Sequence, residues 1–333
     1  MDKRNSFLDF WRFISIIGII LVHIKFKGEL GMVFASVGLW GVALFSVISG
    51  YACYGENNEV MAEKILKRIR KNAVITVIAV FANIVFSFFF MERIGQADLW
   101  IRGFTNPVSY VRMLLLGDFE FFYAGPLWYL VALIKSYFLF YFLVRFDLKK
   151  VIYILMPVTV VMRLVLDTYV RSCGASWHLS ANFPIGVLPM MLVGYVIADR
   201  RKELEKLSLP LLISASSVSA LAMFTASCVR IANVDLSQFF IIPCAAFVFM
   251  TGIRKPEWCK CRPVCFLGKE DSLGIYLLHV MVILILRNIL NRMQISPDIL
   301  FWLLPILSVI FSVLAARLLS LILMPSKNFF AKS

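Results

Sequence analysis

The sequence predicts an all-α integral membrane protein that crosses the bilayer about ten times, with both termini in the cytoplasm. Of its 333 residues, 61% are hydrophobic, and the mean hydropathy is +0.84. A soluble domain usually has an apolar share of about 45–50%. Apolar runs of about 20 residues recur along the chain, which is the length that a helix needs to cross a bilayer. These runs lack the alternating pattern of a transmembrane barrel.

The expected spans follow from the apolar segments and the loop charges. The segments cover residues 7–26, 32–54, 73–91, 123–144, 151–169, 183–198, 209–229, 237–253, 272–290 and 298–324. With the N-terminus in the cytoplasm, every cytoplasmic loop is basic, and these loops hold most of the 34 Lys and Arg residues. The positive-inside rule therefore supports this orientation. Residues 92–122 form the longest outer segment, which has room for a re-entrant or interfacial helix.

The chain is expected to form a single domain over residues 1–333. No fixed-period repeat, linker or appended soluble domain interrupts the apolar pattern, and no signal-peptide cleavage site is evident. The net charge of +14 follows membrane topology, so we expect lipid contacts and no nucleic-acid partner. Cys259, Cys261 and Cys265 lack a fourth ligand of a metal site. We therefore predict no metal and no bound cofactor.

An arginine and a histidine lie inside the first apolar segment, LDFWRFISIIGIILVHIKF. Arg12 and His23 are almost a whole number of helical turns apart, so both share one helix face at a separation of roughly 17 Å. Ionisable groups in hydrocarbon mark a functional site by default. His23 is a candidate general base, with a helix-packing histidine as the alternative. Arg12 is a candidate phosphate ligand, with an interfacial arginine paired to Asp9 as the alternative.

Further basic residues follow the second apolar segment, at the membrane face where Arg12 is expected. The run KILKRIRKNA contains Lys64, Lys67, Arg68, Arg70 and Lys71. Such a run is typical of a topology signal or of contact with anionic lipids. Together with Arg12 it would also form a pocket for a polyphosphate ligand from the cytosol. Ser46 and Ser49 are small residues at helical spacing in FSVISGYACYG. This pattern indicates close helix packing or room for a thin ligand arm.

Polar and aromatic residues of the later segments are candidates for the acceptor site or its support. In GPLWYL, Trp128 lies at the outer interface, where an aromatic belt is expected. Lys135, one to two turns deeper, is an intramembrane charge. In EDSLGIYLLHV, Tyr276 and His279 lie three residues apart on one helix face, with His279 near the middle of the membrane. For His279 a structural role and a catalytic one are both open.

The outer segments contribute three more polar residues. Asp118, Glu120 and His178 are available there to a substrate, although their spacing singles out none of them. We include Glu120 among the candidates for the acceptor site.

Several of these motifs together resemble those of the acyltransferase-3 family of integral membrane O-acyltransferases. Arg12 and His23 match the family's R-x10-H signature, and FSVISGY is similar to its F-F-x-x-S-G-Y motif. The basic loop, GPLWYL and GIYLLH recur in the family in this order. The family's R-x-x-R is matched as Arg68-x-x-Lys71, or in another register as Lys67-x-x-Arg70. The chain is similar to the stand-alone ten-span members.

The resemblance implies an O-acetyltransferase of the bacterial inner or plasma membrane. Such an enzyme moves an acyl group from cytoplasmic acyl-coenzyme A, its co-substrate, to a sugar hydroxyl of a surface polysaccharide or a lipid-linked glycan. His23 takes the place of the family's essential histidine and Arg12 that of its partner. Direct transfer and a covalent acyl-histidine step both fit the residues, and no oligomeric state is predicted.

We expect the phosphates of acyl-coenzyme A to bind Arg12 and residues 64–71, chiefly Arg68, Arg70 and Lys71. The pantetheine arm is then expected to pass Ser46 and Ser49, so that the thioester meets His23. A multi-pass transporter or glycan flippase is the alternative function. Duplicated halves with interrupted helices, which many transporters have, are not apparent in the sequence.

Overall fold

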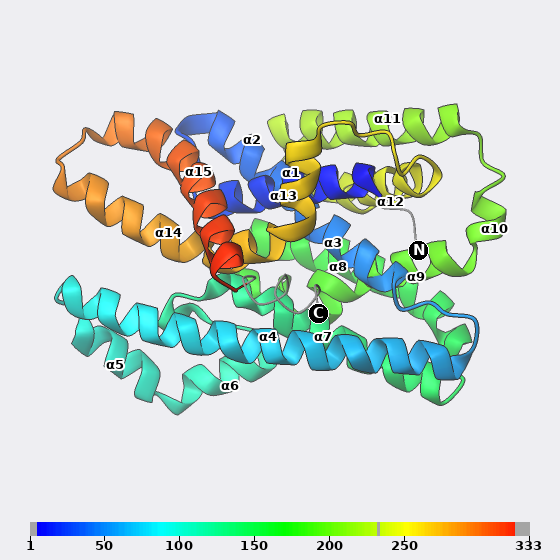
Figure 1. Ribbon diagram of the computed structural model, residues 1–333, viewed down its shortest axis with the longest axis horizontal. Helices are drawn as coiled ribbons and strands as arrows, with labels where there is room; N and C mark the ends of the chain where they lie inside the picture. The colour runs from blue at the N-terminus through cyan, green and yellow to red at the C-terminus, as the bar shows by residue number, and fades with distance from the viewer. Residues whose placement is uncertain (1–4, 232–233, 324–333) are drawn as a thin grey trace, which may run out of the picture. The chain divides into compact units, whose positions relative to one another are not determined.

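The computed structural model describes residues 5–231 and 234–323 (Figure 1). It confirms the all-α class, since the strands within the described residues are one short antiparallel pair, β1 (Arg230–Ile231) and β2 (Val234–Asp235). Eight helices in these ranges are long and apolar enough to cross a membrane, and three apolar helices are shorter. Each of the ten predicted segments coincides with a long helix, a pair of helices or a shorter apolar helix.

Contacts divide the chain into two compact units, which are described separately. Unit 1 comprises residues 1–42 and 248–333, and unit 2 comprises residues 43–247. The boundaries fall within α3 (Trp40–Tyr51) and α12 (Gln238–Arg254). The single domain expected from the sequence stays a prediction.

The helices of unit 1 are α1 (Ser6–His23), α2 (Gly28–Gly38), α13 (Arg262–Glu270), α14 (Ser272–Arg292) and α15 (Pro297–Leu323). Those of unit 2 are α4 (Asn58–Arg93), α5 (Ala97–Thr105), α6 (Pro107–Leu116), α7 (Trp128–Arg145), α8 (Lys149–Cys173), α9 (Leu188–Asp199), α10 (Arg201–Leu204) and α11 (Leu209–Cys228). Unit 2 also has four short turns, η1 (Glu120–Phe122), η2 (Gly125–Leu127), η3 (Trp177–Leu179) and η4 (Phe183–Val187).

Helix α1 is the central helix of unit 1, and two small residues let its neighbours approach its backbone. Asn5 caps its N-terminus by accepting a hydrogen bond from the amide of Leu8 at 2.9 Å. A Cβ added to Gly268 of α13 would lie 1.8 Å from the carbonyl oxygen of Asp9. A Cβ added to Gly38 of α2 would lie 2.3 Å from the carbonyl oxygen of Gly18. Glycine therefore sets how closely both helices pack on α1.

Glycine also allows a close approach of the helices α3 and α9 in unit 2. A Cβ on Gly50 would lie 1.9 Å from the carbonyl oxygen of Met191, and a Cβ on Gly194 would lie 2.0 Å from that of Val47. The two helices thus touch backbone to backbone at the S-G-Y motif. The close-packing interpretation of this motif holds for its glycine.

The long outer segment forms two short helices, α5 and α6, which lie beside α4 as a hairpin (Figure 1). Trp100 of α5 donates from its indole Nε1 to Ser87 Oγ of α4 at 2.9 Å. α6 has no buried residue and ends at Gly117, whose φ of +71° is the left-handed conformation of a helix C-cap. The segment therefore holds the short extra helices for which the sequence has room.

Two predicted cytoplasmic loops are helical instead. α4 begins at Asn58, so the basic run 64–71 forms turns of a helix that continues into the apolar span. α13 occupies part of the predicted loop between the apolar segments 237–253 and 272–290. Neither helical stretch is predicted from the sequence, because both are rich in charged residues and an apolar segment is taken to end where charged residues begin.

Candidate active site

Two histidines meet at the end of α1 within unit 1. His23 is the last residue of α1, and its ring centroid lies 5.1 Å from that of His279 on α14, with the ring planes inclined at 49°. His279 is fully buried, whereas His23 is exposed. The structure therefore supports one reachable imidazole with a second, buried imidazole beside it.

The hydrogen bond of His279 fixes its tautomer. Its Nδ1 lies 2.6 Å from the backbone carbonyl oxygen of Tyr276, and because a carbonyl only accepts, Nδ1 carries the proton. Nε2 of the neutral ring then holds a lone pair, and it has no hydrogen-bond partner among the described residues. The Tyr276 ring lies 5.9 Å from that of His279, as their spacing predicts. The buried histidine thus presents an acceptor nitrogen rather than a donor.

Arg12 is held on α1 by its neighbour Asp9. Its Nη1 donates to Asp9 Oδ1 at 3.1 Å, and the carboxylate is almost fully buried while the guanidinium is about one third exposed. Because α1 is one continuous helix, Arg12 and His23 share a face at a separation of roughly 17 Å.

Unit 2 brings a set of hydroxyl groups together between α3, α4 and α7. The phenol of Tyr129 faces the hydroxyls of Ser46 and Ser49. The phenol of Tyr137 faces Ser49 and the guanidinium of Arg68. Ser46 and Tyr137 are buried, so these groups form a polar line through an otherwise apolar bundle. Such a line suits a thin ligand arm that carries amides and hydroxyls.

The basic residues of α4 lie in different environments. Arg68 is half-buried and faces Tyr137, whereas Arg70 and Lys71 are exposed. Lys64 donates to the carbonyl of Tyr54 at 3.2 Å, and Lys67 pairs with Glu63 at 2.6 Å. Arg68 is therefore the member of the run that points its guanidinium toward the interior of unit 2.

Two of the outer candidates support the fold. Lys135 donates from Nζ to the backbone carbonyl of Leu114, one of the last carbonyls of α6, and so caps that helix. Trp128 opens α7 and packs against Gly186, where an added Cβ would lie 2.9 Å from the indole ring. Glu120 is exposed and accepts a hydrogen bond from Trp177 Nε1 at 3.3 Å.

Tyr137 is a site residue that the sequence does not reveal. An aromatic residue in an apolar span looks like an ordinary packing or lipid-facing side chain. Its spacing from Tyr129 on α7, eight residues or about two turns, is the signal that places both phenols on one face.

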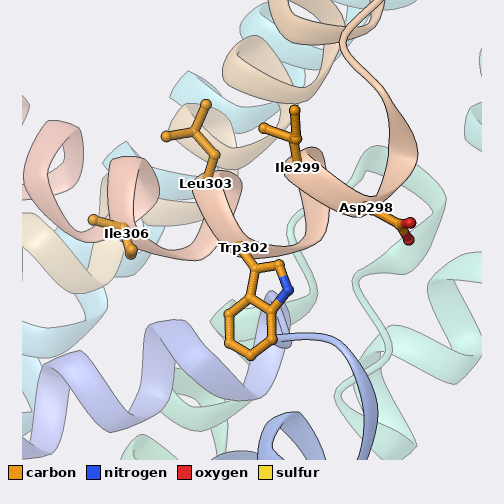
Figure 2. A pocket seen from close by; sticks show the side chains of 5 residues that line it. All are labelled: Asp298, Ile299, Trp302, Leu303 and Ile306. Carbon is orange, nitrogen blue, oxygen red and sulfur yellow. The ribbon is translucent and has the colours of Figure 1, made fainter.

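A hollow on unit 1 holds none of the predicted site residues. It is lined by Asp298, Ile299, Trp302, Leu303 and Ile306, all of them from the first turns of α15 (Figure 2). Four of these five side chains are apolar and one helix supplies all of them. The hollow therefore resembles a surface for a lipid chain more than a reaction centre.

A comparison with protein families finds one match over nearly the whole chain. A family model described as an acyltransferase domain matches residues 5–324, a range that includes Arg12, His23, the α4 basic run and His279. No curated protein and no solved structure matches the chain.

Proposed function

Because the chain belongs to the acyltransferase-3 family and is a multi-pass membrane acyltransferase, we propose that it uses acyl-coenzyme A to acylate a glycan. The donor is acetyl-coenzyme A from the cytoplasm, and the acceptor is a sugar hydroxyl of a surface polysaccharide or a lipid-linked glycan. The enzyme resides in the cell membrane. The observation that carries the proposal is the reachable His23 backed by the buried His279.

His23 acts as the general base in this reaction. Its imidazole removes the proton of the acceptor hydroxyl, and the oxygen attacks the thioester carbonyl carbon. The carbon–sulfur bond breaks as the ester forms, and the imidazolium returns the proton to the departing thiolate of coenzyme A. His23 lies at the C-terminus of α1, where the helix dipole favours the positive charge that the ring gains.

His279 positions His23 in this scheme. Its Nδ1–H is held by the Tyr276 carbonyl, so its Nε2 lone pair can accept a hydrogen bond from one ring nitrogen of His23. The other nitrogen of His23 is then left unprotonated, which is the form a general base needs. A carboxylate often orients a catalytic histidine, and here a neutral imidazole takes that place.

The donor is held through its phosphates and its arm. In unit 2 we assign phosphate binding to the α4 residues Arg68, Arg70 and Lys71, with Arg68 contributing most, and in unit 1 Arg12 is the proposed phosphate ligand. Arg68 is supported by its interior position next to Tyr137. The line of hydroxyls that contains Ser46 and Ser49 supports a path for the pantetheine arm.

The proposal is tested with purified protein in lipid vesicles. Labelled acetyl-coenzyme A is supplied together with a panel of glycan acceptors, and both thiol release and labelled glycan are followed. We expect the two products in equal amounts and only when an acceptor is present. Label transfer from long-chain acyl donors alone would replace the acetyl assignment. Sugar movement without thiol release would contradict the assigned activity.

A further inference from the structure

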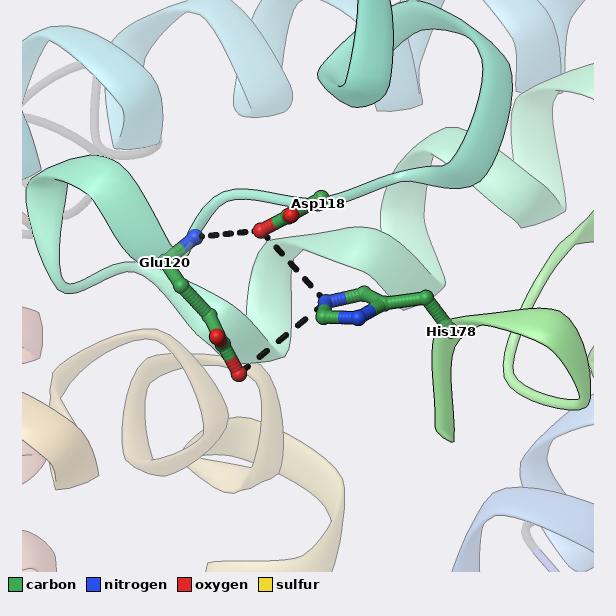
Figure 3. Close-up of side chains that lie close together, drawn as sticks. All are labelled: Asp118, Glu120 and His178. Carbon is green, nitrogen blue, oxygen red and sulfur yellow. Dashed lines mark hydrogen bonds and ion pairs between the residues drawn. The ribbon is translucent and has the colours of Figure 1, made fainter. Parts of the chain in front are cut away.

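Two loops of unit 2 bring a histidine and two carboxylates together. Asp118 and Glu120 follow α6, and His178 lies in the turn after α8 (Figure 3). One ligand atom from each residue lies within 4.8 Å of the other two. Asp118 and His178 are 5% and 2% exposed, whereas the Glu120 side chain is 57% exposed. The cluster is thus closed on one side and open on the other.

The buried imidazole of His178 points a ring nitrogen without a hydrogen-bond partner among the described residues into this cluster. His178 Nε2 lies 3.4 Å from Asp118 Oδ1 and 3.9 Å from Glu120 Oε1, yet it forms no hydrogen bond with any residue that the structure describes. A buried polar nitrogen without a partner loses its hydration and gains no hydrogen bond in return. A ligand bound by the two carboxylates and by this nitrogen together would give the nitrogen a partner.

The two separations measured from His178 Nε2 are close to those of ligands around one metal ion. With bonds of about 2.1 Å and tetrahedral angles, two ligand atoms lie about 3.4 Å apart. The distance from Nε2 to Asp118 Oδ1 equals that value, and the distance to Glu120 Oε1 exceeds it by a margin that a rotation of the exposed Glu120 removes. Direct hydrogen bonds would instead need about 2.7–3.2 Å with good alignment.

Neighbouring groups hold the three side chains as partners of metal ligands usually do. His178 Nδ1 lies 3.0 Å from Ser176 Oγ, which leaves Nε2 as the free nitrogen when Nδ1 donates. Arg112 Nη2 donates to Asp118 Oδ2 at 2.6 Å, while Oδ1, the oxygen that faces His178, accepts a hydrogen bond from the backbone N–H of Glu120 at 3.0 Å. The Trp177 ring stacks on the imidazole with centroids 3.9 Å apart.

We propose that Asp118, Glu120 and His178 bind one divalent transition-metal cation of the Zn²⁺ class. One imidazole and two carboxylates form a mixed nitrogen and oxygen set, which Zn²⁺ accepts at three protein positions. The exposed side of Glu120 leaves a fourth position for water or a hydroxyl. The ion ties the loop after α6 to the turn after α8.

The charges of the cluster fit a divalent ion. With His178 neutral, the two carboxylates and Arg112 leave one net negative charge, which a divalent cation converts to one net positive charge. A proton on His178 is the competing way to balance the carboxylates. It would give an ion-pair cluster that binds no metal.

The test is metal binding to the full-length protein in detergent, without any acyl donor. Isothermal titration with Zn²⁺ alone gives the stoichiometry and affinity, and the visible absorption of Co²⁺ reports the ligand geometry. We expect one Zn²⁺ per chain, and at least about tenfold weaker binding in His178→Gln and Asp118→Asn. Glu120→Gln changes an exposed side chain, so it tests metal binding even if the two variants at buried positions fail to fold.

The matched control is Glu92→Gln, which removes an exposed carboxylate at the end of α4 that is not one of the three cluster residues. Its Zn²⁺ affinity should equal that of the unaltered protein. Absence of Zn²⁺ binding in the folded protein would overturn the proposal in favour of the ion-pair cluster. Binding that survives both His178→Gln and Glu120→Gln would overturn it as well. Neither result bears on acyl transfer through His23, because no donor is present.

Discussion

The imidazole of His23 ends α1, and its environment distinguishes it from the other histidines of the chain. His279 and His178 are buried, whereas His23 can be reached by a substrate. An intramembrane histidine with Arg12 on its helix face was enough to single out His23 in the sequence. Its partner His279 could be named as a candidate but not paired with it, since nothing in a sequence says that α14 packs on α1.

His279→Gln is expected to lower kcat by roughly ten- to a hundredfold, while the KM for acetyl-coenzyme A stays the same. A general base contributes about 10²–10⁴-fold, and a misoriented base loses part of that. Steady-state kinetics in vesicles measures both constants. Ile285→Ala, a change on the exposed side of α14, is the control and should alter neither. An equal loss in both variants would point to a general defect in folding.

Arg68 and Arg70 offer a matched pair on one helix. Arg68→Gln should raise the KM for acetyl-coenzyme A by roughly ten- to a hundredfold, because a hydrogen bond to a charged group contributes about 1.5–3 kcal/mol. Arg70→Gln should raise it less, since that side chain is exposed. Initial rates over a range of donor concentrations give both values. An equal rise in KM for both variants would show that the basic run attracts the donor only through its overall positive charge.

At the level of the helices, hydrophobicity was sufficient to locate a helix in each of the ten apolar segments. It could not locate their ends, because the structure continues some helices into charged residues. α4 keeps its helix through the basic run, and most of the charged side chains there, Lys64, Lys67, Arg70 and Lys71, are exposed on a regular helical backbone. α13 is amphipathic and too polar to be found by an apolar window.

The contact of α3 with α9 makes a prediction about stability. Gly50→Ala forces a methyl group to 1.9 Å from the Met191 carbonyl oxygen, so the two helices must separate. Overpacking of this kind costs about 1–3 kcal/mol. Thermal unfolding in detergent should show a clear loss of stability. Gly125→Ala is the control, because no atom outside its chain neighbours lies within 4 Å of the added carbon. A similar effect in both variants would contradict the tight contact.

For the molecule as a whole, the sequence predicts the class of protein and the candidate site residues. It does not predict which of these residues lie next to one another in the fold. Serine spacing placed Ser46 and Ser49 on one face, but their approach to Tyr129 and to Tyr137 depends on how α3 and α7 pack. The cluster of Asp118 and His178 joins residues of two loops that no periodic pattern links. Side chains from distant segments meet only through tertiary packing, which a single sequence does not encode in its local pattern.

The predicted orientation can be tested with native cysteines. Cys173 lies in a predicted outer segment and Cys261 in a predicted cytoplasmic one, and both are exposed. In chains that retain only one of them, an impermeant maleimide added outside intact cells should label Cys173 and leave Cys261 unmodified. Labelling after lysis confirms that each thiol is reactive. The reverse pattern would invert the topology and place the α4 basic run outside.

The proposed reaction depends most on His23 as the base that activates the acceptor. The direct measurement is transfer of labelled acetyl from acetyl-coenzyme A to a glycan in vesicles that contain His23→Gln protein, matched for amount and fold with the unaltered protein. We predict a rate lower by at least about a hundredfold, with binding of the donor preserved. A His23→Gln protein that transfers acetyl at the normal rate would contradict the mechanism.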